Sequence, residues 1–124
     1  GMNAFLAVAQ GSREQPRFIE LHYNGGAKTD APICLVGKAI TLDAGGLCLK
    51  PSAHISEMKY DMCGGAAVLA VFEAAAEQKW PINLVALIPA CETCLTVPPT
   101  NHHMSLKRSW AKPLKSQILT LKVV

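Results

Sequence analysis

Two apolar runs on either side of an alanine-rich segment constrain the fold of this chain most strongly. Residues 32–42 and 82–89 are mostly apolar, which predicts strands buried on both faces. Residues 62–79 are rich in alanine and gather their polar side chains at the end, so we expect a helix that stops at Trp80-Pro81. A strand, helix, strand order predicts a right-handed crossover in an α/β sheet.

Two further segments have a strand pattern. Residues 17–23 alternate polar and apolar side chains and end at the turn signal 24–26. Near the end of the chain, only residues 118–124 favour a strand. The fold class is therefore α/β.

Length and composition exclude several classes of protein. A chain of 124 residues with 50% hydrophobic and 17% charged residues is one domain, too apolar for disorder. No apolar run is long enough to span a membrane, and the first residues have no basic region of a secretory signal. We therefore expect a soluble, cytoplasmic domain whose five cysteines are reduced thiols.

The charge distribution divides the chain into two pieces. Residues 1–92 hold all nine acidic residues and seven Lys/Arg, whereas residues 93–124 hold five Lys/Arg and no acidic residue. Residues 93–112 mix proline, histidine and basic residues without periodicity. One interpretation is a binding module whose basic tail contacts nucleic acid, although the tail has one aromatic residue, Trp110, and no recognition motif.

Two carboxylates and a lysine are candidates for chemistry. Asp43 follows a predicted strand, and Asp61 precedes the predicted helix. Each has a structural alternative, Asp43 as a turn residue and Asp61 as a helix cap, but carboxylates from separate elements can also share a divalent metal ion. Lys38 lies inside an apolar strand, where an ammonium is costly unless it is paired or reaches the surface. The spacing leaves these alternatives open.

A second metal site is weaker. Cys91, Cys94, His102 and His103 form a Cys/Cys/His/His set, which would make the chain a small zinc-binding module. Adjacent histidines seldom bind one metal ion, and the spacing fits no standard zinc finger.

Two long strings carry a resemblance. VGKAITLDAGGLCLKPS at residues 36–52 and MKYDMCGGA at 58–66 resemble the leucyl aminopeptidase family of two-metal exopeptidases. The resemblance covers about residues 2–92. It implies a partial mixed β-sheet with flanking helices, an internal part of a catalytic domain.

The resemblance also implies roles for individual residues. Lys38 corresponds to a lysine that binds one metal ion through a neutral amine, Asp43 to a carboxylate that bridges both metal ions, and Asp61 to a metal ligand that faces the substrate's amino group. Lys50 corresponds to the catalytic lysine that polarises the scissile carbonyl, and Met58 to a wall of the substrate pocket. The implied cofactors are two divalent ions, Mn²⁺ or Zn²⁺, the implied substrates are peptides, and the family forms homo-oligomers.

The resemblance stops near Glu92. The family's remaining metal ligands and an arginine lie in an Asn-Thr-Asp-Ala-Glu-Gly-Arg motif, which this sequence does not contain. Synonymous codons for residues 117–124 can be chosen so that a shifted reading frame, which starts at the third base of each codon, encodes this motif in order. We therefore expect residues 1–92 to be a partial catalytic domain and residues 93–124 to be a frameshifted, non-familial tail, so that the chain is a truncated and inactive aminopeptidase fragment.

Overall fold

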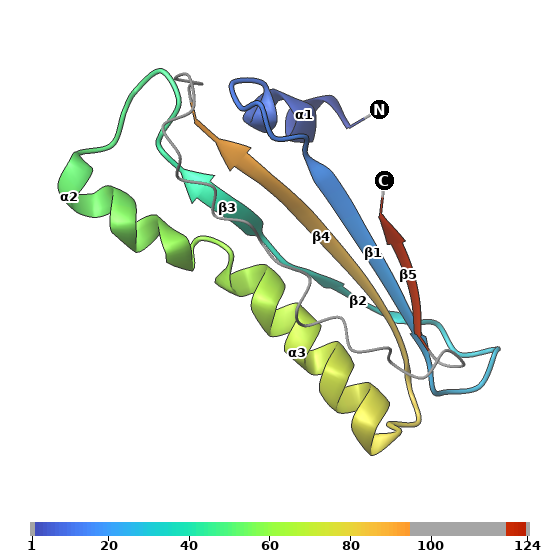
Figure 1. The fold of residues 1–124 in the computed structure, drawn as a ribbon. Helices are drawn as coiled ribbons and strands as arrows, with labels where there is room; N and C mark the ends of the chain where they lie inside the picture. The colour runs from blue at the N-terminus through green and yellow to red at the C-terminus, as the bar shows by residue number, and fades with distance from the viewer. Residues whose placement is uncertain (1, 95–118, 124) are drawn as a thin grey trace.

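The protein is described by a computed structural model that covers residues 2–94 and 119–123. Its described strands form one five-stranded mixed sheet (Figure 1). The α/β class predicted from the sequence is confirmed. Within the described residues, no helix is long and apolar enough to cross a membrane.

Strand β4 (Asn83–Thr93) is the centre of the sheet. It pairs antiparallel with β1 (Arg17–Asn24) along the whole length of β1, and in parallel with β2 (Ile33–Val36) and β3 (Ala39–Asp43). Strand β5 (Leu119–Val123) pairs antiparallel with β1, as the pattern of residues 118–124 predicts. The parallel β3–β4 pair flanks the predicted helix, which confirms the strand, helix, strand unit.

The prediction of one strand over residues 32–42, buried on both faces, is wrong. The run divides into β2 and β3, and Ile33 and Val36 of β2 keep 54% and 71% of their surface exposed. Among the described strands β2 pairs with β4 alone, so one side of it stays open. The division falls at Lys38, whose carbonyl accepts a hydrogen bond from the Gly65 amide at 2.7 Å and leaves the strand ladder.

Helix α3 (Cys63–Gln78) covers one face of the sheet (Figure 1). Its buried face packs against the sheet around the most enclosed side chains, Tyr23, Phe72 and Ile88. The helix ends at Lys79, which has a left-handed φ of 53°. The Tyr23 hydroxyl donates a hydrogen bond to the Trp80 carbonyl at 2.9 Å and so ties the end of the helix to the sheet.

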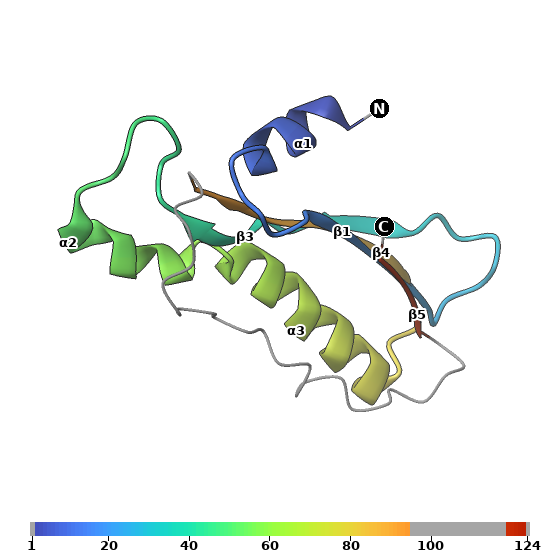
Figure 2. The same cartoon turned by 45° about the horizontal axis from the view of Figure 1, so that its top comes forward.

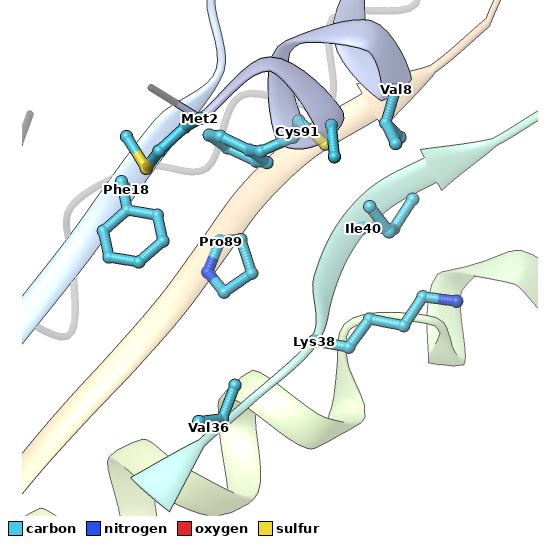
Figure 3. A pocket seen from close by; sticks show the side chains of 10 residues that line it. Met2, Val8, Phe18, Val36, Lys38, Ile40, Pro89 and Cys91 are labelled. Atoms are coloured by element: carbon cyan, nitrogen blue, oxygen red, sulfur yellow. The ribbon is translucent and has the colours of Figure 1, made fainter. Parts of the chain in front are cut away.

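The opposite face of the sheet carries the short helix α1 (Asn3–Ala9), as Figure 2 shows. Phe5 and Ala9 pack there on Ile40 and Cys91. An open apolar groove of about 520 Å³ remains between α1 and the sheet (Figure 3). The connection from β3 to α3 contains α2 (Ser52–Ile55) and a 3₁₀ helix, η1 (Ser56–Tyr60).

Candidate metal centre

The loop after β3 begins at the first candidate ligand, Asp43, the last residue of the strand. Ala44 continues the contact with β4 by donating its amide hydrogen to the Thr93 carbonyl at 2.8 Å. The chain then turns through Gly45, whose φ of 93° a side chain would strain, and closes with a Lys50 amide to Ala44 carbonyl bond of 3.0 Å. This turn brings Lys50 back to the end of β3.

Lys50 bridges Asp43 and Met58. Its ammonium donates to Asp43 Oδ2 at 2.5 Å and to the thioether sulfur of Met58, on η1, at 3.2 Å. The Gly45 amide donates to the other carboxylate oxygen of Asp43 at 2.9 Å, so the turn role predicted as an alternative for Asp43 is present. These three residues, Asp43, Lys50 and Met58, therefore form one contact group, and Lys50 is not a freely solvated side chain.

The charge of Asp43 is stabilised by its neighbours. The hydrogen bond from Lys50 holds the pKa of the Asp43 carboxyl below its usual value of about 3.8, and burial acts in the opposite direction. The Gly45 amide and the positive charge of Lys38 lower this pKa further. Asp43 is therefore an anion at neutral pH, and Lys38 lies close enough to act on it.

Lys38 pairs with Asp61. Lys38 Nζ lies 2.6 Å from Asp61 Oδ1. The Lys38 side chain is 61% exposed, so it is paired and also reaches the surface, the two alternatives to an isolated buried ammonium. Figure 3 shows the side chain extending away from Phe18 and Pro89, so that its charged end leaves the apolar groove.

Asp61 does not act as a helix cap. The residue before α3 is Met62, and no side-chain hydrogen bond caps this helix. Asp61 Oδ2 is instead buried without a hydrogen-bond partner, while the whole side chain is only 18% exposed. A buried polar group without a donor costs about 1–3 kcal/mol, and a charged one more, so this oxygen is a candidate position for a ligand.

The donor set fits a divalent cation. Asp43 and Asp61 supply carboxylate oxygens, which such ions prefer, and Asp61 Oδ2 has no competing donor. Within residues 2–94 and 119–123, no group of three or more His, Cys, Asp and Glu side chains is placed to hold a metal ion. The Lys38 amine, 2.6 Å from Asp61 Oδ1, is a candidate nitrogen ligand beside these two carboxylates.

The alternative zinc set is not assembled by the described residues. Cys91 is buried, and Cys94 Sγ lies 3.7 Å from Glu92 Oε2. Burial raises the pKa of both thiols above their usual value. His102 and His103 lie outside the described residues.

Close backbone contacts at Gly37 and Gly65, which the strand and helix patterns do not predict, position Lys38. A Cβ on Gly37 would lie 2.7 Å from the Gly64 carbonyl oxygen and 2.8 Å from Gly65 Cα, so only glycine lets α3 begin this close to the strand. A Cβ on Gly65 would lie 2.9 Å from the Ala39 side chain. The signal in the sequence was the pair of adjacent glycines at the predicted helix start.

Fold and site together define an α/β domain with a candidate divalent-metal centre at the carboxyl end of β3. The profile described as "Cytosol aminopeptidase family, catalytic domain" matches residues 1–97. The chain belongs to the cytosol aminopeptidase family.

Individual relatives agree with this assignment. The chain is 62% identical over 92 residues to a "Probable cytosol aminopeptidase" of Acidovorax sp. (strain JS42) and 59% identical to one of Acidithiobacillus ferrooxidans (strain ATCC 53993 / BNL-5-31). Each match covers 74% of this chain and 18% of the relative. The chain thus spans about a fifth of the length of these relatives.

Solved structures show the same fold. The crystal structure of cytosol aminopeptidase from Coxiella burnetii aligns with a TM-score of 0.69 and 33% identity, over 75% of this chain and 20% of that chain. The bottromycin maturation enzyme BotP in complex with Mn aligns with a TM-score of 0.66 and 41% identity, again over 75% of this chain and 20% of that chain. The implied partial mixed sheet with flanking helices is therefore confirmed.

Proposed function

We propose that this chain carries part of the two-metal centre of an aminopeptidase, in which Lys38, Asp43 and Asp61 bind divalent ions. The observation that carries the proposal is the buried, unpartnered oxygen Asp61 Oδ2 beside Lys38, whose positive charge also acts on Asp43. The similar BotP structure that contains Mn supports Mn²⁺ as one of the ions, and Zn²⁺ is the other candidate.

The proposed reaction is the release of the N-terminal amino acid from a peptide. Bound divalent ions supply Lewis acidity and an activated water. The Lys50 ammonium donates a hydrogen bond to the oxygen of the scissile carbonyl, where negative charge develops. Met58 forms an apolar wall for the N-terminal side chain, and Asp61 accepts a hydrogen bond from the substrate's amino group.

The 124-residue chain by itself is expected to be inactive. It contains no Asn-Thr-Asp-Ala-Glu-Gly-Arg motif, which by resemblance holds two further metal ligands and an arginine. Groups that act as a unit lose their effect together when some are removed. We expect no metal-dependent hydrolysis of leucine p-nitroanilide by the 124-residue chain, and turnover like that of a complete enzyme would contradict this.

Metal binding is tested directly on the full chain. Titration with Mn²⁺, followed by the electron paramagnetic resonance signal of the free ion, should show binding that Asp61→Asn weakens about tenfold or more. Glu57→Gln is the matched control, because it removes an equally charged but 65% exposed carboxylate on η1. Equal binding by the two variants would refute the assignment of Asp61.

The peptidase function is tested in a complete enzyme. A hybrid in which residues of this chain replace the matched 92-residue segment of the Acidovorax relative should hydrolyse leucine p-nitroanilide. In that hybrid, Lys50→Met should lower kcat about 100-fold or more, because the oxyanion loses its donor. A folded hybrid without activity, or full activity of Lys50→Met, would overturn the proposal.

We further propose that residues 1–92 are the catalytic part and that residues 93–124 come from a shifted reading frame. The acid-free composition of the second piece supports this division. All five cysteines are free thiols, which supports a cytoplasmic location for the protein. Sequencing the gene around the Glu92 codon tests the frame: an alternative frame without Asp-Ala-Glu-Gly-Arg would contradict it.

A further inference from the structure

The two carboxylates of the candidate metal centre differ in how they are engaged. Both oxygens of Asp43 have donors, Oδ1 from the Gly45 amide and Oδ2 from the Lys50 ammonium. Asp61 uses only Oδ1, in its pair with Lys38. A cation that approaches the cluster therefore meets a free oxygen on Asp61 but an occupied carboxylate on Asp43.

We propose that the Lys50 ammonium competes with a metal ion for Asp43, so that a divalent ion binds this carboxylate only after the ammonium has left it. This inference rests on the proposed function and adds the control of metal loading to it. The physical reason is charge: an ammonium at 2.5 Å from Oδ2 occupies the oxygen itself and repels a second cation beside it.

The surroundings of Lys50 allow the exchange. Its side chain is 33% exposed, so the lysine is only partly enclosed and has room to turn toward solvent. The Met58 sulfur, 3.2 Å away on η1, is a second acceptor that keeps the ammonium near the site after it leaves Asp43. Release from Asp43 then frees the same ammonium for the carbonyl oxygen of a bound peptide. Binding of the metal ion to Asp43 and release of the Lys50 ammonium toward the substrate are thereby coupled.

The test compares Mn²⁺ binding by four forms of the full 124-residue chain at one pH and ionic strength. Lys50→Gln removes the charge and keeps an amide that can donate to Asp43. Lys59→Gln is the matched control, because it removes the same charge from a lysine that lies over the Tyr60 ring, 5.0 Å from its centre, and forms no ion pair with a carboxylate in the described residues. Lys50→Arg keeps a cation on Asp43.

We expect Lys50→Gln to bind Mn²⁺ about fivefold more tightly than the unmodified chain, as loss of a partly exposed ion pair predicts. Lys59→Gln should stay within about twofold of the unmodified chain, since a solvent-screened charge contributes little. Lys50→Arg should bind no more tightly than the unmodified chain. Thermal unfolding of each variant establishes that the compared proteins are folded. If Lys50→Gln does not fold, Lys50→Arg is compared with the unmodified chain instead. Tighter Mn²⁺ binding by Lys50→Arg would contradict the proposal.

Failure of this inference differs from failure of the proposed function. If the unmodified chain binds Mn²⁺ in a manner that requires Asp61, and Lys50→Gln binds equally or more weakly, Lys50 is not a competitor and the metal centre stands. If no form binds Mn²⁺, including Lys50→Gln, both the competition and the metal centre are refuted.

Discussion

Replacement of Gly37 by alanine tests how the sheet and α3 place the candidate metal centre. The new Cβ would lie 2.7 Å from the Gly64 carbonyl oxygen and 2.8 Å from Gly65 Cα, both backbone atoms of the helix. Backbone cannot turn aside as a flexible side chain does, so α3 must move away from β2 and β3. The 2.7 Å bond from the Gly65 amide to the Lys38 carbonyl lengthens with it.

The expected loss follows from two opposing effects. Overpacking of this kind costs about 1–3 kcal/mol. Alanine lowers the entropy of the unfolded chain relative to glycine, which offsets about 0.4–1 kcal/mol. Within the described residues the glycines with positive φ are Gly45 and Gly46, so alanine at position 37 adds no backbone strain. The net prediction for Gly37→Ala is a destabilisation of about 1–2 kcal/mol.

Urea unfolding followed by circular dichroism measures this loss. Val36→Ala is the control, because it alters the neighbouring residue, whose side chain is 71% exposed, and should change the free energy of unfolding by less than about 0.5 kcal/mol. Gly37→Ala should also weaken Mn²⁺ binding, since movement of α3 separates Asp61 from Lys38. Equal stability of the two variants would show that the close approach of α3 does not hold the site together.

Three further predictions concern the hydrogen bonds, thiols and charges of the described residues. Tyr23→Phe should lower the free energy of unfolding by about 1–2 kcal/mol, because the Trp80 carbonyl loses its donor; urea unfolding measures it. Iodoacetamide at about pH 8 should label Cys91 last, because burial raises the pKa of this thiol, and mass spectrometry should find the exposed thiols labelled first. The exposed thiols are Cys34, Cys48 and Cys63. Because folding lowers the pKa of Asp43, the ionised carboxylate stabilises the fold at pH values above its usual pKa of about 3.8. This contribution is lost as the pH falls through the lowered pKa of the folded protein. Asp43→Asn should therefore show a smaller loss of stability on acidification than the unmodified chain.

Each of these three predictions has an opposing result. A phenylalanine variant as stable as the unmodified chain would show that the Trp80 carbonyl finds another donor. Early labelling of Cys91 would place its thiol near solvent. A parallel decline of the two acid unfolding curves would mean that Asp43 keeps the same proton affinity in the folded and unfolded chain.

The main secondary structure was predictable because it depends on local periodicity. The alternation in residues 17–23 and the apolar run at 82–89 correspond to β1 and β4, although β4 extends to Thr93. The alanine-rich segment corresponds to α3, within one residue at each end. These patterns reflect which side chains face the core, and burial of those side chains is what stabilises these strands and this helix.

The break between β2 and β3 was not predictable from the same pattern. It depends on the Gly65 amide taking the Lys38 carbonyl out of the ladder, a contact between residues far apart in the sequence. The exposure of Ile33 depends likewise on β2 having one partner strand. The apolar composition of a segment does not predict how many strands will pair with it, nor where a helix distant in the sequence will pack.

The candidate site was partly predictable. The positions of Asp43 and Asp61 at the ends of elements predict them as candidates, and the turn contact of Asp43 with Gly45 is present. The unpartnered oxygen of Asp61 and the bridging position of Lys50 depend on side-chain packing between the loop and η1. Spacing in the sequence does not reveal such packing, and the roles assigned by family resemblance remain predictions.

The most direct test of the proposed metal centre is the anomalous diffraction of a crystal of this chain soaked with Zn²⁺. We expect an anomalous peak about 2.0–2.2 Å from a carboxylate oxygen of Asp61, with Lys38 turned toward the ion and Lys50 displaced from Asp43. A Zn²⁺ peak bound elsewhere, with the Lys38–Asp61 and Lys50–Asp43 pairs both unchanged, would contradict it.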